Sequence, residues 1–321
     1  MAKRNPILPF VAKRGAFVLD GGLATELEAQ GADLSDDLWS ARLLRDDPDM
    51  IQNVHLAYFK AGADCALTAS YQATIPGFMA QGMSEFEALR LMWLSVNLAV
   101  RARDAFWADT TNHVGRERPL VVASVGPYGA YLADGSEYRG DYDLDEDDLT
   151  DWHRRRWRIL AGTQADLLAC ETIPSLTEAR AQMRLLQETP ERMAWFSFSC
   201  QDGNRISDGT PIAECAAYLD QFEQVAAVGI NCTPPRFLPD LIQAVFAVTQ
   251  KPIIVYPNSG ETYDAARKHW QGHAVPAEFG TLSRAWRKLG ASGVGGCCRT
   301  RPAHIQQICC SLSKAVCPPK L

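Results

Sequence analysis

Short apolar runs recur along the chain, and each is followed by a longer stretch with apolar residues at helical spacing. The runs are rich in Val, Ile, Leu and Ala and end in polar residues, Gly or Cys. Near-continuous apolar strands of this kind are typical of a parallel sheet covered on both faces. We predict eight strands, at residues 16–21, 65–70, 120–125, 165–171, 194–199, 227–232, 252–258 and 293–298.

The stretches between the runs predict helices, several of which open with Ser, Thr, Asp or Pro near the first turn. Eight strand-and-helix units favour a closed α/β barrel, the (β/α)8 TIM barrel, over an open sheet. Two long segments that are not plainly helical, residues 71–82 and 126–146, each follow a strand and are expected to form the rim of an active site. The clearest helices are expected at residues 48–62, 83–107, 175–188, 211–223, 236–248 and 302–315.

The length of 321 residues suits a single barrel domain, residues 1–321, with its core at about residues 15–315. A composition of 47% hydrophobic and 22% charged residues is that of a globular protein. The net charge of −6 argues against a nucleic-acid partner, which usually requires a basic surface. The arginine-rich segment 153–158 has a helical pattern and is interpreted as a solvated helix face.

The sequence shows no signal for secretion or membrane insertion. Prolines at positions 6 and 9 interrupt the apolar run that a signal peptide needs, and no apolar stretch of 18 residues follows. A cytoplasmic protein is therefore expected. Ten cysteines in a reducing compartment do not form a disulfide framework, so their positions are examined for metal binding or catalysis.

Three cysteines fall at the carboxyl ends of predicted strands, where barrel enzymes place their chemistry. Cys232 ends the sixth strand, and Cys297 and Cys298 end the eighth, 65 residues later. Neighbouring residues within a strand point to opposite faces, so this pair can share an ion only where the strand bends. Gly295 and Gly296 are expected to supply the conformational freedom for that bend. Three thiolates leave a fourth position of Zn²⁺ open, as in catalytic zinc sites.

The alternative is that these cysteines are small buried apolar residues, which is the interpretation we adopt for Cys65, Cys170, Cys200 and Cys215. A disulfide between the adjacent Cys297 and Cys298 is disfavoured, because it would close a strained ring. The six histidines show no pair at ligand spacing on a strand end and supply no rival site.

Several motifs follow one another along the chain and together resemble the homocysteine S-methyltransferases, most closely the branch that uses S-methylmethionine as methyl donor. The resemblance runs from about residue 15 to about residue 305. Its motifs are Leu19-Asp20-Gly21-Gly22, Thr68-Ala69-Ser70-Tyr71-Gln72, Ser124-Val125-Gly126-Pro127, Ala169-Cys170-Glu171-Thr172, Gly229-Ile230-Asn231-Cys232, Tyr256-Pro257-Asn258-Ser259-Gly260-Glu261 and Gly295-Gly296-Cys297-Cys298-Arg299-Thr300.

The resemblance implies the same barrel and a zinc ion held by Cys232, Cys297 and Cys298. It also implies that Asp20 and Glu171 grip the ammonium group of a substrate, although a helix cap and a buried hydrogen-bonded carboxylate are simpler interpretations of these two residues. The substrate-binding residues it implies are Asp20, Gly21, Gly22, Thr68, Ser70, Gln72, Glu171 and Asn231.

The implied reaction is zinc-dependent methyl transfer from S-methylmethionine, or also from S-adenosylmethionine, to the thiol of L-homocysteine, giving methionine. Betaine as donor, selenocysteine as acceptor and a non-catalytic barrel that binds zinc or thiols remain alternatives. A separate S-adenosylmethionine domain is not expected, since no strand is followed by a G-x-G-x-x-G turn. Nothing in the sequence indicates an oligomeric state. Candidates for contacting a cationic donor are the rim residues Tyr71, Tyr128, Tyr131, Tyr138 and Tyr142.

Overall fold

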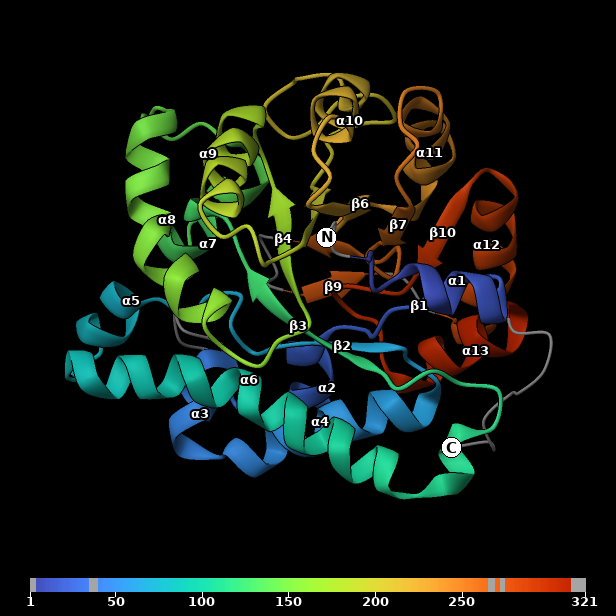
Figure 1. Ribbon diagram of the computed structural model, residues 1–321, viewed down its shortest axis with the longest axis horizontal. Helices are drawn as coiled ribbons and strands as arrows, with labels where there is room; N and C mark the ends of the chain where they lie inside the picture. The colour runs from blue at the N-terminus through green and yellow to red at the C-terminus, as the bar shows by residue number, and fades with distance from the viewer. Residues whose placement is uncertain (1–3, 35–39, 265–268, 272–274, 313–321) are drawn as a thin grey trace.

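A computed structural model describes residues 4–34, 40–264, 269–271 and 275–312 of the protein. All eight predicted strands are present and pair in parallel within one sheet, which confirms the (β/α)8 barrel. Figure 1 shows the strands in the middle of the molecule with the helices around them. The strands are β1 (Phe17–Val18), β2 (Cys65–Leu67), β3 (Leu120–Val125), β4 (Leu167–Ile173), β5 (Ala194–Phe198), β6 (Val225–Asn231), β7 (Ile253–Tyr256) and β10 (Ala291–Val294).

The predicted helices are present with ends shifted by a few residues, except that residues 313–315 of the last one lie outside the described residues. They are α4 (Pro48–Ala61), α6 (Glu85–Ala108), α9 (Leu176–Gln187), α10 (Ile212–Asp220), α11 (Leu238–Phe246) and α13 (Pro302–Leu312). Two further helices, α8 (Glu146–Ala161) and α12 (Pro276–Lys288), complete the outer layer. The remaining elements are α1 (Leu8–Arg14), α2 (Leu23–Ala29), α3 (Ser40–Asp46), η1 (Thr110–His113), η3 (Pro235–Phe237) and a small hairpin of β8 (Thr262–Asp264) and β9 (His269–Gln271).

The barrel closes between β1 and β2 through aspartate side chains. These two strands stand at the two ends of the sheet order β1-β10-β7-β6-β5-β4-β3-β2. The Asp64 backbone N–H donates to the Val18 carbonyl oxygen (2.6 Å), and the Val18 N–H donates to the Asp64 carboxylate (2.9 Å). Farther along, the Leu67 N–H donates to the Asp20 carboxylate (2.8 Å). Asp20 and Asp64 therefore bridge the junction between β1 and β2, which we call the barrel seam.

Apolar side chains fill the amino-terminal half of the barrel interior. Helix α1 lies beside β1 in Figure 1, and this helix and the residue before it add Phe10 and Ile7 to this interior cluster. The Phe10 and Phe17 rings meet edge to face with centroids 5.2 Å apart, and Phe17 in turn contacts Trp195 (6.5 Å). Because this end is packed with apolar groups, the polar residues collect at the carboxyl ends of the strands.

The two rim segments are more regular than predicted. Residues 71–82 contain the short helix α5 (Ile75–Ala80), and residues 126–146 contain α7 (Tyr128–Leu132) and the 3-10 turn η2 (Ser136–Tyr138). Thr74 caps α5 by accepting a hydrogen bond from the Gly77 N–H (3.0 Å). These elements are too short for hydrophobic periodicity to mark them.

The solvated-face interpretation of residues 153–158 is wrong for three of them, of which Trp157 is an apolar residue of the core. His153 and Arg156 are buried on the inner side of α8, whereas the Arg155 side chain is 55% exposed. The guanidinium of Arg156 donates to the carbonyl oxygens of Gly126 (2.9 Å), Ser70 (2.5 Å) and Tyr71 (2.5 Å). Burial is tolerated because these carbonyls satisfy the arginine, a pairing that a pattern of polar residues cannot reveal.

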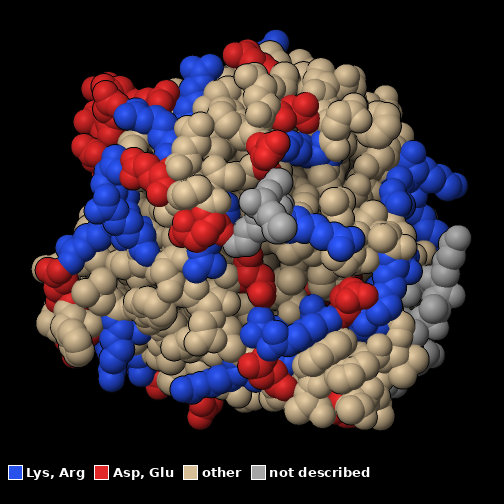
Figure 2. All heavy atoms as spheres, viewed as in Figure 1, with Lys and Arg blue, Asp and Glu red and all other residues tan. Residues whose placement is uncertain are grey.

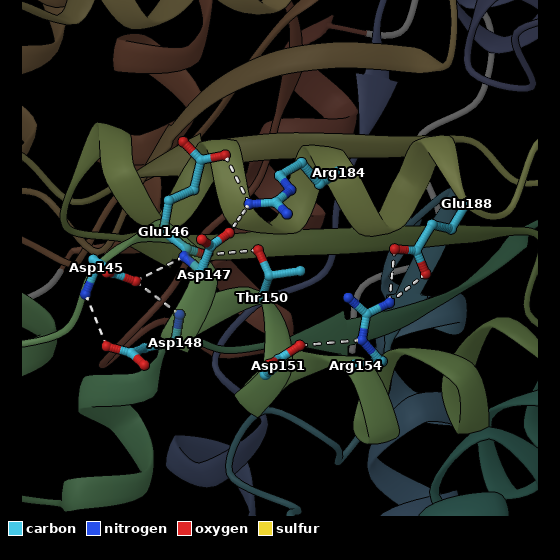
Figure 3. A network of polar contacts seen from close by, with 9 residues as sticks. All are labelled: Asp145, Glu146, Asp147, Asp148, Thr150, Asp151, Arg154, Arg184 and Glu188. Atoms are coloured by element: carbon cyan, nitrogen blue, oxygen red, sulfur yellow. Dashed lines mark hydrogen bonds and ion pairs between the residues drawn. The ribbon is translucent and has the colours of Figure 1, made fainter.

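The outer surface of α8 and α9 carries an ion-pair network (Figure 3). Arg184 pairs with Glu146 (3.3 Å) and Asp147 (2.6 Å) across the two helices, and Arg154 pairs with Glu188 (2.5 Å). Figure 2 shows Lys and Arg interspersed with Asp and Glu over the visible face. Within the described residues, no helix combines the length and hydrophobicity that crossing a bilayer requires.

Candidate metal centre and substrate pocket

Three cysteine sulfurs converge at the carboxyl end of the barrel. Cys232 directly follows β6, and Cys297 and Cys298 lie in the turn after β10. Their Sγ atoms all lie within 4.8 Å of one another, and they form the group of potential metal ligands in the described part of the chain. Cys232 and Cys297 are joined as a disulfide, and Cys298 is a free thiol. The adjacent pair 297–298 is not bonded to itself, as predicted, and the disulfide instead joins the ends of β6 and β10.

Two residues at the carboxyl ends of strands have unusual backbone angles. Cys232 has a φ of 47°, and Thr172, which follows Glu171 in β4, has a φ of 59°. Side chains rarely adopt this left-handed region, and a β-branched residue there is a real outlier. Such strain is found where a functional group must face a particular direction.

The glycines before the cysteine pair serve a different purpose from the one predicted. Neither Gly295 nor Gly296 has a positive φ, so conformational freedom is not the reason for them. A Cβ on Gly295 would lie 2.8 Å from the Asp20 carbonyl oxygen, and one on Gly296 would lie 2.6 Å from Cβ of Thr300. Glycine is needed because the turn after β10 packs directly against the turn after β1.

The donor set fits a thiophilic metal ion. With metal–sulfur bonds of about 2.3 Å, three ligands of one zinc ion lie within about 4 Å of each other. The three sulfurs here lie within 4.8 Å of one another, which is compatible with one shared ion. Burial raises the pKa of the Cys298 thiol to about 11, so a thiolate at neutral pH needs a cation beside it. Cys65, Cys170, Cys200 and Cys215 are buried elsewhere, as expected of small apolar side chains.

The three cysteines line a pocket whose empty volume, with its open mouth, is about 810 Å³. Of the predicted substrate-binding residues, Gly21, Gly22, Thr68, Gln72 and Glu171 line it as well. A Cβ on Gly22 would lie 2.6 Å from the Cys297 carbonyl oxygen, so this glycine allows the two turns to meet at the pocket floor.

Two buried carboxylates lie near this floor: Glu171 lines the pocket, whereas Asp20 lies outside the lining. Asp20 is 1% exposed, and one of its oxygens has no hydrogen-bond partner among the described residues. Glu171 is 6% exposed and accepts hydrogen bonds from the hydroxyls of Ser124 and Tyr256. Burial raises the pKa of Glu171 to about 7 and raises that of Asp20, which also feels the charge of Glu171. Neither carboxylate forms an ion pair within the described ranges, so a ligand cation would complement both.

Ser70 and Asn231 lie behind the pocket wall. The Ser70 hydroxyl donates to the Ser124 carbonyl oxygen (2.7 Å). The Asn231 side chain accepts from the Thr172 N–H (2.8 Å) and donates to the Thr172 hydroxyl (2.8 Å). Both are buried. Their observed contacts hold neighbouring chain segments, and Asn231 fixes the strained Thr172 in the pocket lining.

The five rim tyrosines divide into two groups. Tyr71 and Tyr138 line the pocket. The other three pack around one another and Trp152, with Tyr128 and Trp152 centroids 5.0 Å apart. Glu137 also lines the pocket, although the sequence did not single it out as a site residue. Its position in a rim segment, next to the candidate Tyr138, is the feature of the sequence that could have indicated it.

Comparison with known proteins decides the family. The sequence model described as homocysteine S-methyltransferase matches residues 17–312. Homocysteine S-methyltransferase YbgG of Bacillus subtilis is 55% identical over 304 residues, which cover 95% of this chain and 96% of that protein. The chain belongs to the homocysteine S-methyltransferase family. This confirms the predicted family and the enzyme class, a methyltransferase.

Other members of the family bear on the acceptor and on the cysteines. A selenocysteine methyltransferase of Astragalus bisulcatus is 48% identical over 331 residues, covering 97% of each chain. The oxidized crystal form of the homocysteine methyltransferase MmuM of Escherichia coli superposes with a TM-score of 0.86, at 44% identity and 95% and 99% coverage of the two chains. Its metallated form superposes with a TM-score of 0.84 at 42% identity and the same coverage. MmuM is thus known both oxidised and with metal.

Proposed function

We propose that the protein transfers a methyl group from S-methylmethionine to the thiol of L-homocysteine, with zinc held by Cys232, Cys297 and Cys298. The observation that carries this proposal is the meeting of three cysteine sulfurs and the buried Glu171 carboxylate in one pocket, with the buried Asp20 carboxylate close to Glu171. Three thiol ligands suit zinc and leave a coordination position for substrate. The reduced thiols also require a reducing compartment, which supports a cytoplasmic location.

The chain's own residues would bind and orient the acceptor. Asp20 and Glu171 would hold the ammonium group of homocysteine, and the hydroxyls of Ser124 and Tyr256 keep the Glu171 carboxylate in place. When bound, zinc would supply the positive charge that lets a substrate thiol ionise at neutral pH. Asn231 would act indirectly, by fixing Thr172.

The reaction then needs two aligned sulfurs and no general base in the transfer step. A bond forms between the acceptor sulfur and the methyl carbon while the donor S–CH3 bond breaks, and its electron pair stays on the donor sulfur. The donor sulfonium becomes the neutral thioether of methionine, and the acceptor becomes methionine as well. Holding the two sulfurs in line lowers the barrier by several kcal/mol, about 7 or more in favourable cases.

The test measures metal content and methionine formation under reducing conditions. The variants Cys232→Ala, Cys297→Ala and Cys298→Ala should each lose bound zinc and at least about a thousandfold of kcat/KM, a barrier increase of about 4 kcal/mol. Cys215→Ala is the matched control, since Cys215 is buried on α10, outside the pocket lining, and it should keep both. Full activity in any metal-free variant would defeat the proposal.

Selenocysteine is the second candidate acceptor, because of the Astragalus relative. A panel of acceptors (homocysteine, selenocysteine) and donors (S-methylmethionine, S-adenosylmethionine, betaine) compares kcat/KM values directly. Homocysteine with S-methylmethionine should give the highest value. A larger value for another pair would change the assigned substrate while leaving the metal site in place.

A further inference from the structure

Glu137 is a buried carboxylate that forms no ion pair within the described residues and has one oxygen without a hydrogen-bond partner there. It lies in η2, within the rim segment, and is 6% exposed. Its backbone is fixed, since the Glu137 carbonyl oxygen accepts from the Ser199 hydroxyl (3.1 Å) and Gly129 packs beneath its Cα. Its Oε2 atom, in contrast, is buried without a hydrogen-bond partner among the described residues.

The charge of Arg139 acts on Glu137 but does not outweigh its burial, and the two residues form no ion pair. Arg139 pairs with Asp141 (3.1 Å) and Asp134 (3.9 Å), and its side chain is 49% exposed. Burial raises the pKa of Glu137, so its ionised form is disfavoured in the ligand-free protein. An unpaired buried carboxylate of this kind lowers stability and is expected to be retained for a ligand.

The pocket gives this carboxylate a definite place relative to the reacting atoms. Glu137 lines the same pocket as Cys297 and Cys298 and is close enough to Cys298 to influence its charge. The hydroxyl of Tyr138 lies beside the Cys298 thiol, and Tyr71 also feels the charge of Glu137. Glu137 therefore belongs to the rim side of the sulfur cluster, whereas Asp20 and Glu171 belong to the floor.

We propose that Glu137 recognises the positive sulfonium group of the methyl donor, with the rings of Tyr71 and Tyr138 beside it. The proposal rests on the proposed function and assigns one residue within it. The floor carboxylates would hold the acceptor's ammonium group, so the remaining carboxylate near the sulfurs is left for the donor's cation. Aromatic faces next to a carboxylate make a suitable site for a sulfonium ion.

The charge change during transfer predicts a particular kinetic effect. The sulfonium loses its positive charge as its methyl group leaves, so Glu137 attracts the bound donor more strongly than the transition state or the thioether product. A residue of this kind lowers the KM of the donor and does not raise kcat. The neutral product is held less tightly, which favours its release.

Glu137→Gln is the first test, because it removes the charge and keeps the shape. The KM of S-methylmethionine should rise about 10- to 100-fold, as for loss of a charged hydrogen-bonded contact, with kcat changed less than about threefold. The KM of homocysteine and the zinc content should not change. Asp134→Asn is the matched control: it removes the same charge from an exposed side chain (55%) on the same segment and should match the wild type.

A binding experiment separates the sulfonium from the donor's ammonium group. The probes are S-methylmethionine and its neutral carbon isostere 2-amino-5-methylhexanoate, titrated calorimetrically into the zinc-loaded protein. The wild type should prefer the sulfonium by about tenfold or more, and Glu137→Gln should lose that preference. Equal weakening of both ligands would overturn the proposal, since Glu137 would then bind the group they share.

The two proposals fail in different ways. If the wild type turns over S-methylmethionine and the Glu137→Gln variant has an unchanged KM, the role of Glu137 is contradicted but the proposed function is not. A wild type that neither binds nor turns over S-methylmethionine contradicts the proposed donor and, with it, this assignment.

Discussion

Two buried carboxylates, those of Glu171 and Glu137, line one pocket, and a third, that of Asp20, lies outside its lining but near enough to Glu171 to feel its charge. None of the three forms an ion pair within the described residues. Ionising such groups in the folded protein costs free energy, because burial removes water and nothing replaces its stabilisation. The pocket is therefore arranged for cationic ligands at the expense of the stability of the empty protein. Neutralising any of these carboxylates should therefore stabilise the empty protein and weaken the binding of a cationic ligand.

Glu171→Gln should stabilise the empty protein at alkaline pH and abolish homocysteine binding. The pKa of Glu171 is raised from 4.5 to about 7 on folding, so the folded state holds the proton more tightly. Stability is then highest below about pH 4.5 and falls as the pH rises through about 7. At pH 8 the variant should gain about 2 to 3 kcal/mol, and at pH 4 the gain should vanish. Urea denaturation at both pH values measures this.

The control for this experiment is Glu188→Gln, an exposed residue directly after α9. Its unfolding free energy should stay within about 0.5 kcal/mol of the wild type at both pH values. If Glu171→Gln is no more stable than the wild type at pH 8, the carboxylate is neutralised in the empty protein by a group that the structure does not pair with it.

At the scale of residues, the sequence pointed to the cysteines and the floor carboxylates but not to Glu137. Cys232 and the pair 297–298 end predicted strands, and parallel strands bring such ends together by geometry alone. Glu137 follows no strand directly. Its burial depends on contacts with Ser199 and Gly129, which are 62 and eight residues away in the chain, and no local pattern encodes them.

At the scale of elements, α8 organises the rim through Arg156. Its guanidinium holds the carbonyl oxygens of Ser70, Tyr71 and Gly126, which come from the turns after β2 and β3. Strands and long helices followed from hydrophobic spacing, because their burial repeats with a fixed period. The position of the rim could not be predicted from hydrophobic spacing, because it depends on one polar side chain whose partners are backbone atoms.

Arg156→Met should loosen the rim without removing α8. Three buried carbonyl oxygens would lose their charged donor, which should lower the unfolding free energy by about 2 to 4 kcal/mol. Because Tyr71 lines the pocket, the KM of the donor should also rise. Arg155→Met changes an exposed neighbour on the same helix and should stay within about 1 kcal/mol of the wild type. Equal stability of the two variants in urea would contradict this role of Arg156.

At the scale of the whole molecule, two sets of ion pairs differ in what they hold together. Asp64 lies at the barrel seam, is fully buried, and pairs with Arg14. The pairs of Arg184 with Glu146 and Asp147 lie on the surface between α8 and α9 (Figure 3). Exposed pairs contribute little because water and salt screen them, whereas breaking a buried pair leaves an uncompensated charge inside the protein.

Asp64→Asn should therefore destabilise the whole barrel by about 3 to 5 kcal/mol, since Arg14 would remain buried without its counter-ion. Arg184→Met should cost less than about 1 kcal/mol, and that cost should shrink further in 1 M salt. Urea denaturation monitored by circular dichroism measures both. Because the seam joins the first strand of the sheet order to the last, its loss should shift the single unfolding transition of the barrel rather than detach one helix. A second, separate transition in Asp64→Asn would show that the barrel does not depend on this closure.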